Sequence, residues 1–215
     1  MEELVLSTFA NLPPAKQEKI IEAALDEFAD KGYQPASVNV MVSASGIAKG
    51  SLYQYFKDKK SLFLYVFQVG IGLVRRTLMR VKEETAEQNF FHRMEQSLLA
   101  GVDFIHRHPK IYRIYLKIMF DQQVPERDRL LAAVRRFAAD YLSSLVRQGR
   151  ARGEIRADIS MPSLIFMLDA LLDRFLQAVC VPAFDVTLNL DQAGAEEIRE
   201  RVRELVGILR QGLAP

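Results

Sequence analysis

Apolar residues recur along most of the chain at spacings of three and four, the period of an amphipathic α-helix. In the first clear stretch Ile21 and Phe28 lie on one stripe, while acidic side chains occupy the opposite positions. Pro14 begins this stretch and Gly32 follows it, as expected at the start and the end of a helix. Alternation of apolar and polar residues, the mark of a strand, is hard to find. The pattern therefore predicts an all-α protein.

Three more helices are predicted directly after the first. Ser37 is a plausible N-cap residue for a short helix that ends near residue 46. A third helix covers about residues 48–56, and a fourth runs from Lys59 toward Arg80. Three helices joined by short turns form a helix-turn-helix module. Its expected core consists of Phe28, Val38, Met41, Ile47, Leu52, Phe56 and Leu62.

Longer helices are predicted in the second half of the chain, after a polar stretch at residues 82–88. They cover about 90–107, 111–120, 126–148, 162–181 and 195–211. A hydrophobic segment within residues 1–13 is a possible extra N-terminal helix. We therefore expect a helix-turn-helix domain over residues 1–60 and a second helical domain over residues 61–215.

The predicted helix at residues 162–181 is apolar on more than one stripe, whereas a surface helix needs only one. Together with the last helix it could form a four-helix interface with a second copy of the chain. The alternative is a single larger core. The residues expected at the dimer interface are Leu164, Leu168, Leu171, Phe175, Val202, Leu205 and Leu209.

Aromatic residues and methionines are dense between residues 90 and 175. Most of them belong to a core, but some could line a cavity for an apolar ligand with a few polar anchors. The candidates for this ligand site are Tyr115, Met119, Tyr141 and Phe166. Nothing in the pattern names the ligand.

Net charge is only +2 over 215 residues, so the informative charge is local. Residues 47–60 contain four lysines and a single aspartate, which forms a small basic patch on a nearly neutral chain. The single cysteine, Cys180, has apolar neighbours and is expected to be buried and inert. The acidic N-terminus and the lack of an apolar run of about 18 residues lead us to expect a soluble, cytoplasmic protein without a membrane partner.

The helix predicted at residues 48–56 carries the groups that can read DNA. A helix that presents a lysine, hydroxyls and an amide fits the major groove. Ser51 and Gln54 are the expected base readers, since glutamine can form two hydrogen bonds with adenine. Lys49 and Tyr53 would contact phosphates. The alternative is an ordinary solvated polar surface.

Three further residues complete this candidate DNA-binding set. Gly50 has no side chain and would let the backbone approach a phosphate or a base edge closely. Lys59 lies at a predicted helix N-terminus, where the helix dipole adds to its charge and favours a phosphate. Ser37 could contact a phosphate as well as cap its helix, and capping alone is the simpler interpretation.

Residues 16–63 resemble the tetracycline-repressor (TetR) family of bacterial transcription regulators. The landmarks are Ala23-Ala24-Leu25, Phe28, Lys31-Gly32-Tyr33, Ser37, Ala44, Gly46-Ile47, Lys49-Gly50-Ser51-Leu52-Tyr53, Tyr55-Phe56, Lys59 and Leu62. The resemblance implies an all-helical homodimer with an N-terminal DNA-binding domain and a C-terminal domain for effector binding and dimerisation. The chain departs from the family pattern at Val40, Val42 and Ala48, where polar, smaller or helix-capping residues are usual.

The resulting hypothesis is a ligand-responsive transcription regulator, a repressor released from a palindromic DNA operator by a small apolar or amphipathic effector. No nucleophile–base pair, phosphate loop or catalytic carboxylate pair is evident, so an enzyme and a cofactor are not expected. His106 and His108 lie two positions apart, on different faces of a helix, which argues against a metal site. The alternatives are a helical protein-interaction module that no longer binds DNA, and a carrier that sequesters small molecules.

Overall fold

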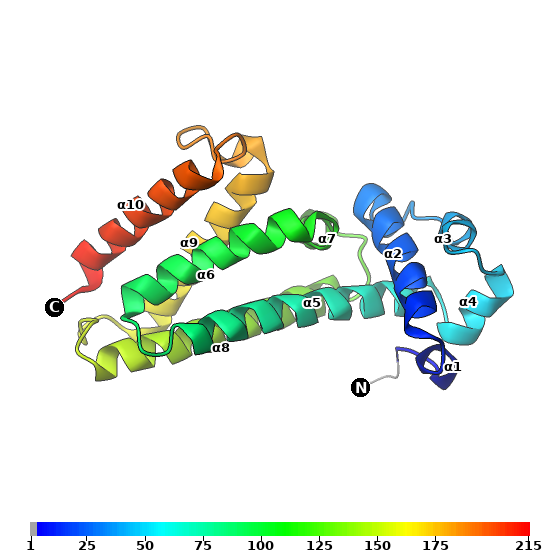
Figure 1. The fold of residues 1–215 in the computed structure, drawn as a ribbon, viewed down its shortest axis with the longest axis horizontal. Coiled ribbons are helices and arrows are strands. Elements are labelled where there is room, and N and C mark those ends of the chain that lie inside the picture. Colours follow the sequence, from blue (N-terminus) through cyan, green and yellow to red (C-terminus); the bar gives the residue numbers. More distant parts are fainter. Residues whose placement is uncertain (1–3) are drawn as a thin grey trace. The chain divides into compact units, whose positions relative to one another are not determined.

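The structure, a computed structural model, describes residues 4–215. Helices dominate these residues and no strand is found among them, which confirms the predicted all-α class (Figure 1). The helices of the first half are α1 (Ser7–Ala10), α2 (Pro14–Lys31), α3 (Val38–Ser45), α4 (Lys49–Tyr55) and α5 (Lys59–Glu84). Those of the second half are α6 (Phe90–Arg107), α7 (Pro109–Phe120), α8 (Arg127–Ala151), α9 (Met161–Cys180), the 3-10 helix η1 (Pro182–Phe184) and α10 (Ala195–Leu213).

The helix ends follow local sequence signals. Pro14 is the first residue of α2, and Gly32 follows its end with a φ of 82°, in the left-handed region that suits glycine. Gly46 ends α3 in the same way, with a φ of 69°. The possible helix near the N-terminus is present as α1, and α5 extends a few residues beyond its predicted end.

Two compact units divide the chain. The first contains the chain up to Val74 together with His108–Leu131, and the second contains Arg75–Arg107 and Ala132–Pro215. Helix α5 begins in the first unit and ends in the second. The domain boundary predicted between residues 60 and 61 falls inside the first unit. Where the DNA-binding domain ends therefore stays a prediction.

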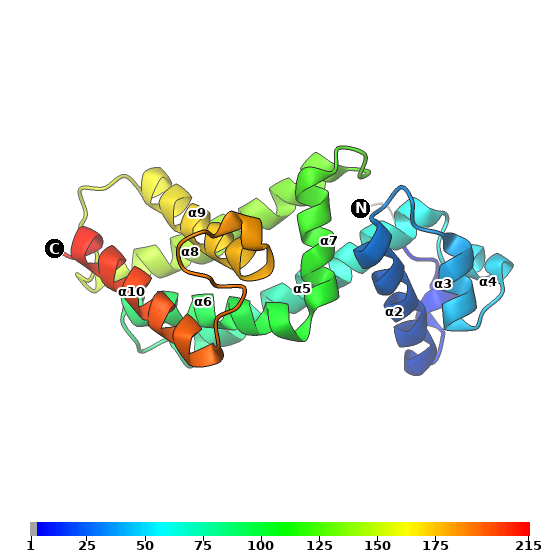
Figure 2. The same ribbon diagram turned by 90° about the horizontal axis from the view of Figure 1, so that it is seen from above.

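The first unit has an aromatic core built from α1, α2, α4 and α5, and Figure 2 shows α2, α3 and α4 grouped together. Phe28, Phe56 and Leu62 are almost completely buried, as predicted. Phe9 of α1 is also buried, and its ring lies 4.9 Å from that of Phe56. Of the predicted core, Met41 and Leu52 are buried too, whereas Val38 and Ile47 are half-buried.

Helix α7 packs on α2 in the first unit, and rows of opposite charge lie on these two helices. The acidic row on α2 consists of Glu22, Asp26 and Asp30, and the basic row on α7 consists of Lys110, Arg113 and Lys117. The Lys110 ammonium contacts the Asp26 carboxylate and lies 3.9 Å from that of Glu22. The pKa of Asp30 is held below its usual value mainly by Lys31, with smaller contributions from Lys117 and Arg113.

The segment after α7 is tied back to the first turn of α5. Glu126 has a φ of 54°, uncommon for a residue with a side chain, and its carboxylate lies 2.7 Å from the Lys60 ammonium. Arg127 donates from Nε to the Ile118 carbonyl at 3.0 Å, near the C-terminal end of α7. Both contacts fix the path of the chain between α7 and α8.

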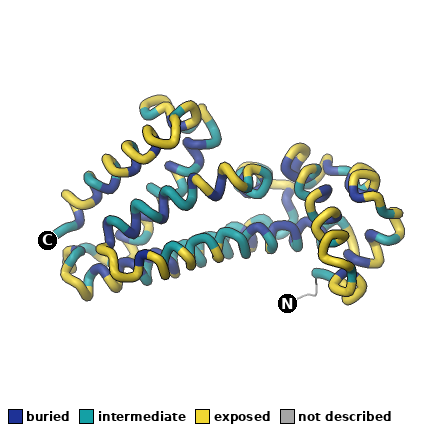
Figure 3. The backbone as a smooth tube through the Cα atoms, viewed as in Figure 1, coloured by how far each residue is buried: buried dark blue, intermediate teal, exposed yellow. Residues whose placement is uncertain are grey.

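The second unit has its own core, formed by α6, α8, α9 and α10. Met94, Leu142, Leu168 and Val202 represent the four helices there, and all four are buried. Figure 3 shows buried and exposed positions alternating along α10, which keeps one face in the core. Arg135 of α8 also bridges two carboxylates of α9, since its guanidinium lies within 3.0 Å of both Asp169 and Asp173.

One helix among the described residues, α5, is long and apolar enough by length and composition to cross a membrane. Its best window has a mean hydropathy of 1.4, and 33% of that window is buried inside the structure. The core helices of soluble proteins meet the same two criteria, so this finding is weak evidence for a membrane span. Leu62, Phe63 and Val66 of α5 are buried in the core of the first unit, which accounts for part of its apolar character.

The paired charged rows predict a salt-dependent contribution to stability. Lys110→Glu should lower the free energy of unfolding, because it places a carboxylate against Asp26 and Glu22. Adding Asp26→Lys should restore part of the loss, with a coupling free energy of about 0.5–1 kcal/mol for this exposed pair. Urea unfolding of the two single variants and the double variant measures the coupling, which should shrink in high salt. Strict additivity at low salt would contradict an interaction between these rows.

A second prediction concerns the packing around Gly149 in α8. A Cβ atom there would lie 2.8 Å from Ile155 Cδ1 and 3.0 Å from Phe90 Cβ. Gly149→Ala should therefore destabilise the protein by about 1–3 kcal/mol through overpacking. Gly207 of α10 is the matched control, since nothing lies within 4 Å of a Cβ at that position. Gly207→Ala should cost nothing or stabilise slightly in the same thermal unfolding assay.

Candidate nucleic-acid interface

Helix α4 presents one apolar and one polar face. Leu52 and Tyr55 are buried, and the Tyr55 ring packs against Phe9 with 6.0 Å between centroids. Lys49, Tyr53 and Gln54 are exposed on the other face. This agrees with the helical geometry that predicted Leu52 inside and the polar residues outside. Ser51, the other predicted base reader, is half-buried.

Gly50 is the second residue of α4, and nothing lies within 4 Å of a Cβ placed there. Its backbone is helical, so neither internal packing nor a left-handed conformation requires a glycine. A glycine inside a helix costs up to about 1 kcal/mol relative to alanine. The open space on this side is available to an external partner, which is the reason the sequence suggested for the glycine.

The ammonium group of Lys59 is used by the protein itself. It donates to the carbonyl oxygens of Gln34 at 3.0 Å and Ala36 at 3.2 Å, and it lies 4.8 Å from the Tyr33 ring centroid. These contacts hold the loop between α2 and α3. A lysine ammonium has three hydrogens to donate, so one remains for a phosphate. The predicted phosphate contact is therefore geometrically possible and stays a prediction.

Ser37 occupies the N-cap position of α3, but its hydroxyl accepts no hydrogen bond from the first turn. The predicted side-chain cap is therefore not formed. Its backbone amide donates instead to Glu27 Oε1 at 2.8 Å. The α2 carboxylate thus fixes the start of α3, a tertiary contact that the local sequence does not indicate.

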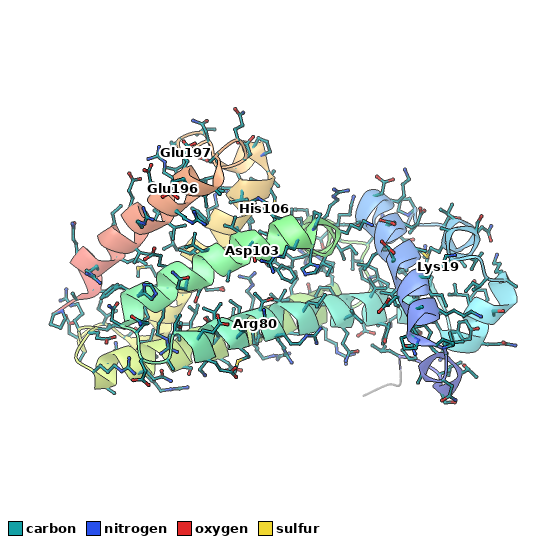
Figure 4. All side chains as sticks on the ribbon, viewed as in Figure 1. Lys19, Arg80, Asp103, His106, Glu196 and Glu197 are labelled. Atoms are coloured by element: carbon teal, nitrogen blue, oxygen red, sulfur yellow. The ribbon has the colours of Figure 1, made fainter. Side chains whose placement is uncertain are left out.

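Two exposed polar residues of the helix-turn-helix part were missed by sequence reasoning. Lys19, labelled on α2 in Figure 4, places its ammonium 3.7 Å from the position of a Cβ on Gly46, at the turn between α3 and α4. Asn39 is exposed in the first turn of α3. The position of Lys19 in the folded module carries no sequence signal, because 27 residues separate it from the turn. Asn39 could have been noticed as a polar residue next to the expected N-cap.

The four predicted ligand residues are divided between the two units. Tyr115 and Met119 belong to the first unit, and Tyr141 and Phe166 belong to the second. Tyr141 is buried and its hydroxyl forms a 2.7 Å hydrogen bond with that of Ser97; burial raises its pKa. Phe166 is 77% exposed, which does not fit a wall of an internal cavity in one subunit.

A pocket of about 320 Å³ lies in the second unit, between α9, the segment after it and α10. It is lined by Leu171, Arg174, Phe175, Ala178, Phe184, Asp185, Val186, Thr187, Leu188, Leu190 and Leu205. None of the four predicted ligand residues is part of this lining. The Arg174 guanidinium lies over the Phe184 ring at 4.9 Å.

The residues predicted for the dimer interface mostly face the core of their own subunit. Leu164, Leu168, Phe175, Val202 and Leu209 are buried within the second unit, and Leu171 and Leu205 are half-buried. The burial of these five residues within one subunit fits the alternative of a single larger core better than it fits a dimer interface. The same two helices expose Phe166, Met167 and Ile208, of which Ile208 is 66% exposed. Helices α9 and α10 keep the expected helical period, but the apolar residues that they expose are not the ones predicted for the interface.

Residues that could support metal or thiol chemistry are not assembled into a site. No cluster of three His, Cys, Asp or Glu side chains suited to a metal ion occurs within residues 4–215. Figure 4 shows His106 on α6 with Asp103 one turn before it, and His106 is exposed. Burial raises the pKa of Cys180 to about 11, which keeps its sulfur protonated and unreactive at neutral pH.

The helix-turn-helix part of the chain matches a known family. The sequence profile of bacterial regulatory proteins of the tetR family covers residues 20–66, from α2 into α5. The HTH-type transcriptional repressor AcnR of Corynebacterium diphtheriae is 26% identical over 196 residues, which are 89% of each chain. YerO of Bacillus subtilis, an uncharacterized HTH-type regulator, is 24% identical over 93% of this chain, which spans only 66% of that relative.

Solved structures extend the similarity to the whole chain. A TetR-family regulator from Chloroflexus aurantiacus superimposes with a TM-score of 0.72, with 28% identity, over 98% of this chain and 99% of the other. FadR of Bacillus subtilis, solved with stearoyl-CoA, shares the fold with a TM-score of 0.68 and 18% identity, over 88% of this chain and 96% of the other.

The fold and the exposed face of α4 define a helix-turn-helix DNA-binding protein that regulates transcription. The chain belongs to the TetR family. Proteins of this family are regulators, so the chain is not an enzyme. The expected family and function class are confirmed, while the individual site residues stay predictions.

Gly50→Ala should change the stability of the protein and its affinity for DNA in opposite directions. The alanine meets no neighbour and removes a poor helix former, so the protein should become more stable by up to about 1 kcal/mol. Affinity for DNA should fall, because the added methyl group stands between the backbone and its partner. Thermal unfolding and fluorescence anisotropy with a labelled operator measure the two effects. Unchanged DNA affinity would show that the glycine serves no close approach.

Proposed function

We propose that the chain acts as a homodimeric repressor that leaves a palindromic operator when a small amphipathic effector binds. The observation that carries this proposal is the two-faced α4, with Leu52 and Tyr55 anchored in an aromatic core and a polar face open to solvent. A recognition helix in the major groove needs such an anchored, exposed polar face. The similarity to named repressors such as AcnR supports the direction of regulation.

The residues of α4 divide into phosphate contacts and base contacts. Lys49 and Tyr53 would contact phosphates, and Ser51 and Gln54 would contact base edges. Lys59 and Lys19 lie on the same module and are further candidates for phosphates, which would widen the small basic patch that the sequence shows. Four or more such contacts would make binding strongly dependent on salt.

Dimerisation would use the exposed apolar residues of α9 and α10. Phe166, Met167 and Ile208 are large apolar side chains that lie open to solvent in the single chain. Burying them against the same residues of a second copy would give a two-fold symmetric interface. A symmetric pair of α4 helices would then read two half-sites about one turn of DNA apart, or a multiple of it.

An effector would act through α5, which begins in the first unit and ends in the second, and through α7, which packs on α2. Helix α5 is continuous between the units, and α7 carries the basic row that faces the acidic row of α2. The effector can shift the equilibrium between two states only by its differential affinity for them. Stearoyl-CoA bound to FadR is a precedent for an amphipathic effector in this fold.

The roles within α4 can be tested by comparing two substitutions. Lys49→Ala should weaken binding to every DNA sequence and lower the salt slope of the binding constant by roughly one, because one counterion-releasing contact is lost. Gln54→Ala should instead relax the preference at one base position, by about 1–3 kcal/mol of discrimination. Anisotropy titrations at several salt concentrations, with the operator and single-base variants of it, provide both readouts.

Lys57 gives a matched control for the loss of one positive charge. It is exposed and lies just beyond α4, so Lys57→Ala should change the salt slope less than Lys49→Ala. Equal slopes for wild type and Lys49→Ala would contradict the docking proposed for α4. No binding to the chain's own upstream DNA would favour the protein-interaction alternative, for which the 51% exposed Val40 is a candidate contact.

A further inference from the structure

Arg93, in the first turn of α6, is a buried cation without a buried counter-charge. Only 2% of the residue is exposed. Its Nη1 donates to the side-chain oxygen of Gln148 at 2.5 Å, and its Nη2 donates to the Lys82 carbonyl at 3.3 Å. Its Nε has no hydrogen-bond partner. Among the residues the structure describes, no carboxylate forms a salt bridge with this guanidinium.

Such an arrangement is costly. Guanidinium groups stay protonated in proteins, and removing a charge from water without pairing it is strongly unfavourable. Burial is accordingly the main cause that lowers the pKa of Arg93. Arg152 is close enough to repel it, and the more favourable Glu154 has an oxygen engaged with the Phe90 amide at 2.7 Å. The protein thus keeps an unneutralised positive charge inside the second unit.

Two hydroxyl groups lie close to Arg93. Ser97, one turn further along α6, is hydrogen-bonded to the Arg93 carbonyl and to the Tyr141 hydroxyl, both at 2.7 Å. Tyr141 also interacts electrostatically with Arg93. A buried guanidinium with an unused Nε donor is a suitable environment for a carboxylate or a phosphate.

Gln148 occupies the place that a counter-ion would take. It is an exposed residue of α8, and its side-chain oxygen contacts the buried Arg93 guanidinium. Its neutral amide oxygen accepts one hydrogen bond, whereas a guanidinium can donate two parallel hydrogen bonds to a single anion. An anion that replaces this amide would pair with the charge and keep the hydrogen bond.

We propose that Arg93 is the recognition point for an anionic effector, whose carboxylate or phosphate group replaces the amide oxygen of Gln148. The positive charge of Arg93 selects the acid group, and the Tyr141 hydroxyl, which is bonded to Ser97, lies close by. Tyr141 was a predicted ligand residue, and this site gives it a specific partner. Binding of the anion stands on the geometry of the second unit alone, and its role as an effector rests on the proposed function.

The first test measures thermal unfolding of the full chain with octanoate, acetate or inorganic phosphate at constant ionic strength, with chloride as the reference. Ligand binding to the folded state should raise the melting temperature in proportion to the logarithm of anion concentration. A response to octanoate but not to phosphate identifies a carboxylate ligand, and the reverse identifies a phosphate. Phosphate also stabilises proteins in general, so each response is compared between variants.

Two substitutions at the site should both abolish the anion response, for different reasons. Gln148→Glu supplies the missing carboxylate within the chain, so it should raise the melting temperature and abolish the anion response. Arg93→Met removes the charge and should also abolish the response, whatever it does to stability. Arg136→Met, at an exposed arginine of α8, is the matched control and should leave the response intact.

Specific outcomes would overturn the proposal. These are the absence of any anion response in the wild type beyond that of chloride, an unchanged response in Arg93→Met, or a destabilised Gln148→Glu. A last arm adds octanoate and phosphate to the complex with operator DNA, where the anion that stabilises the free protein should weaken binding. If the anion response is absent while Lys49→Ala still lowers the salt slope of DNA binding, only the anionic effector is refuted, and the proposed repressor function stands.

Discussion

Helix α5 is the element on which the rest of the structure depends, because it belongs to both compact units. Its first half packs Leu62, Phe63 and Val66 into the aromatic core of the helix-turn-helix part, and its last turns contribute to the second unit. Helix α5 runs without a break across the boundary at Val74 and Arg75. Its N-terminal turn lies in the first unit. Lys59 and Lys60 lie in that turn, and both are bound to neighbouring segments of the first unit.

Helix α7 packs on α2 within the first unit, through a contact of a different physical kind. The contact between its basic row and the acidic row of α2 is electrostatic and exposed, so each pair contributes little and salt weakens it further. Apolar cores are packed tightly and tolerate few small shifts, whereas exposed ion pairs can change partner at low cost. Within the first unit, an aromatic core therefore anchors α4, whereas α7 and α2 meet partly through exposed ion pairs.

The sequence predicted what short-range physics determines. Helical period, proline and glycine positions located every long helix within a few residues, and the same period assigned the buried and exposed faces of α4. Prediction from the sequence failed where a side chain's contacts come from residues far apart in the chain. The loop carbonyls that occupy Lys59, the ammonium of Lys19 beside Gly46 and the glutamate that fixes Ser37 all come from other segments. The dimer residues stay a prediction, and five of them are already buried in their own subunit. An apolar helix shows how much must be buried, but only the packed neighbours show which stripe the subunit itself covers.

Charges in the second unit follow two contrasting rules, and the contrast makes Arg93 unusual. Asp185 accepts hydrogen bonds from the backbone amides of Leu188, Leu190 and Thr187, and these lower its pKa to about 2. Its charge is thus stabilised by the loop that it organises. Arg93 is far more buried, yet it receives only a neutral amide and a carbonyl oxygen. A charge satisfied by its own backbone is structural, whereas a buried charge left without a counter-ion is the feature expected of a site that a ligand completes.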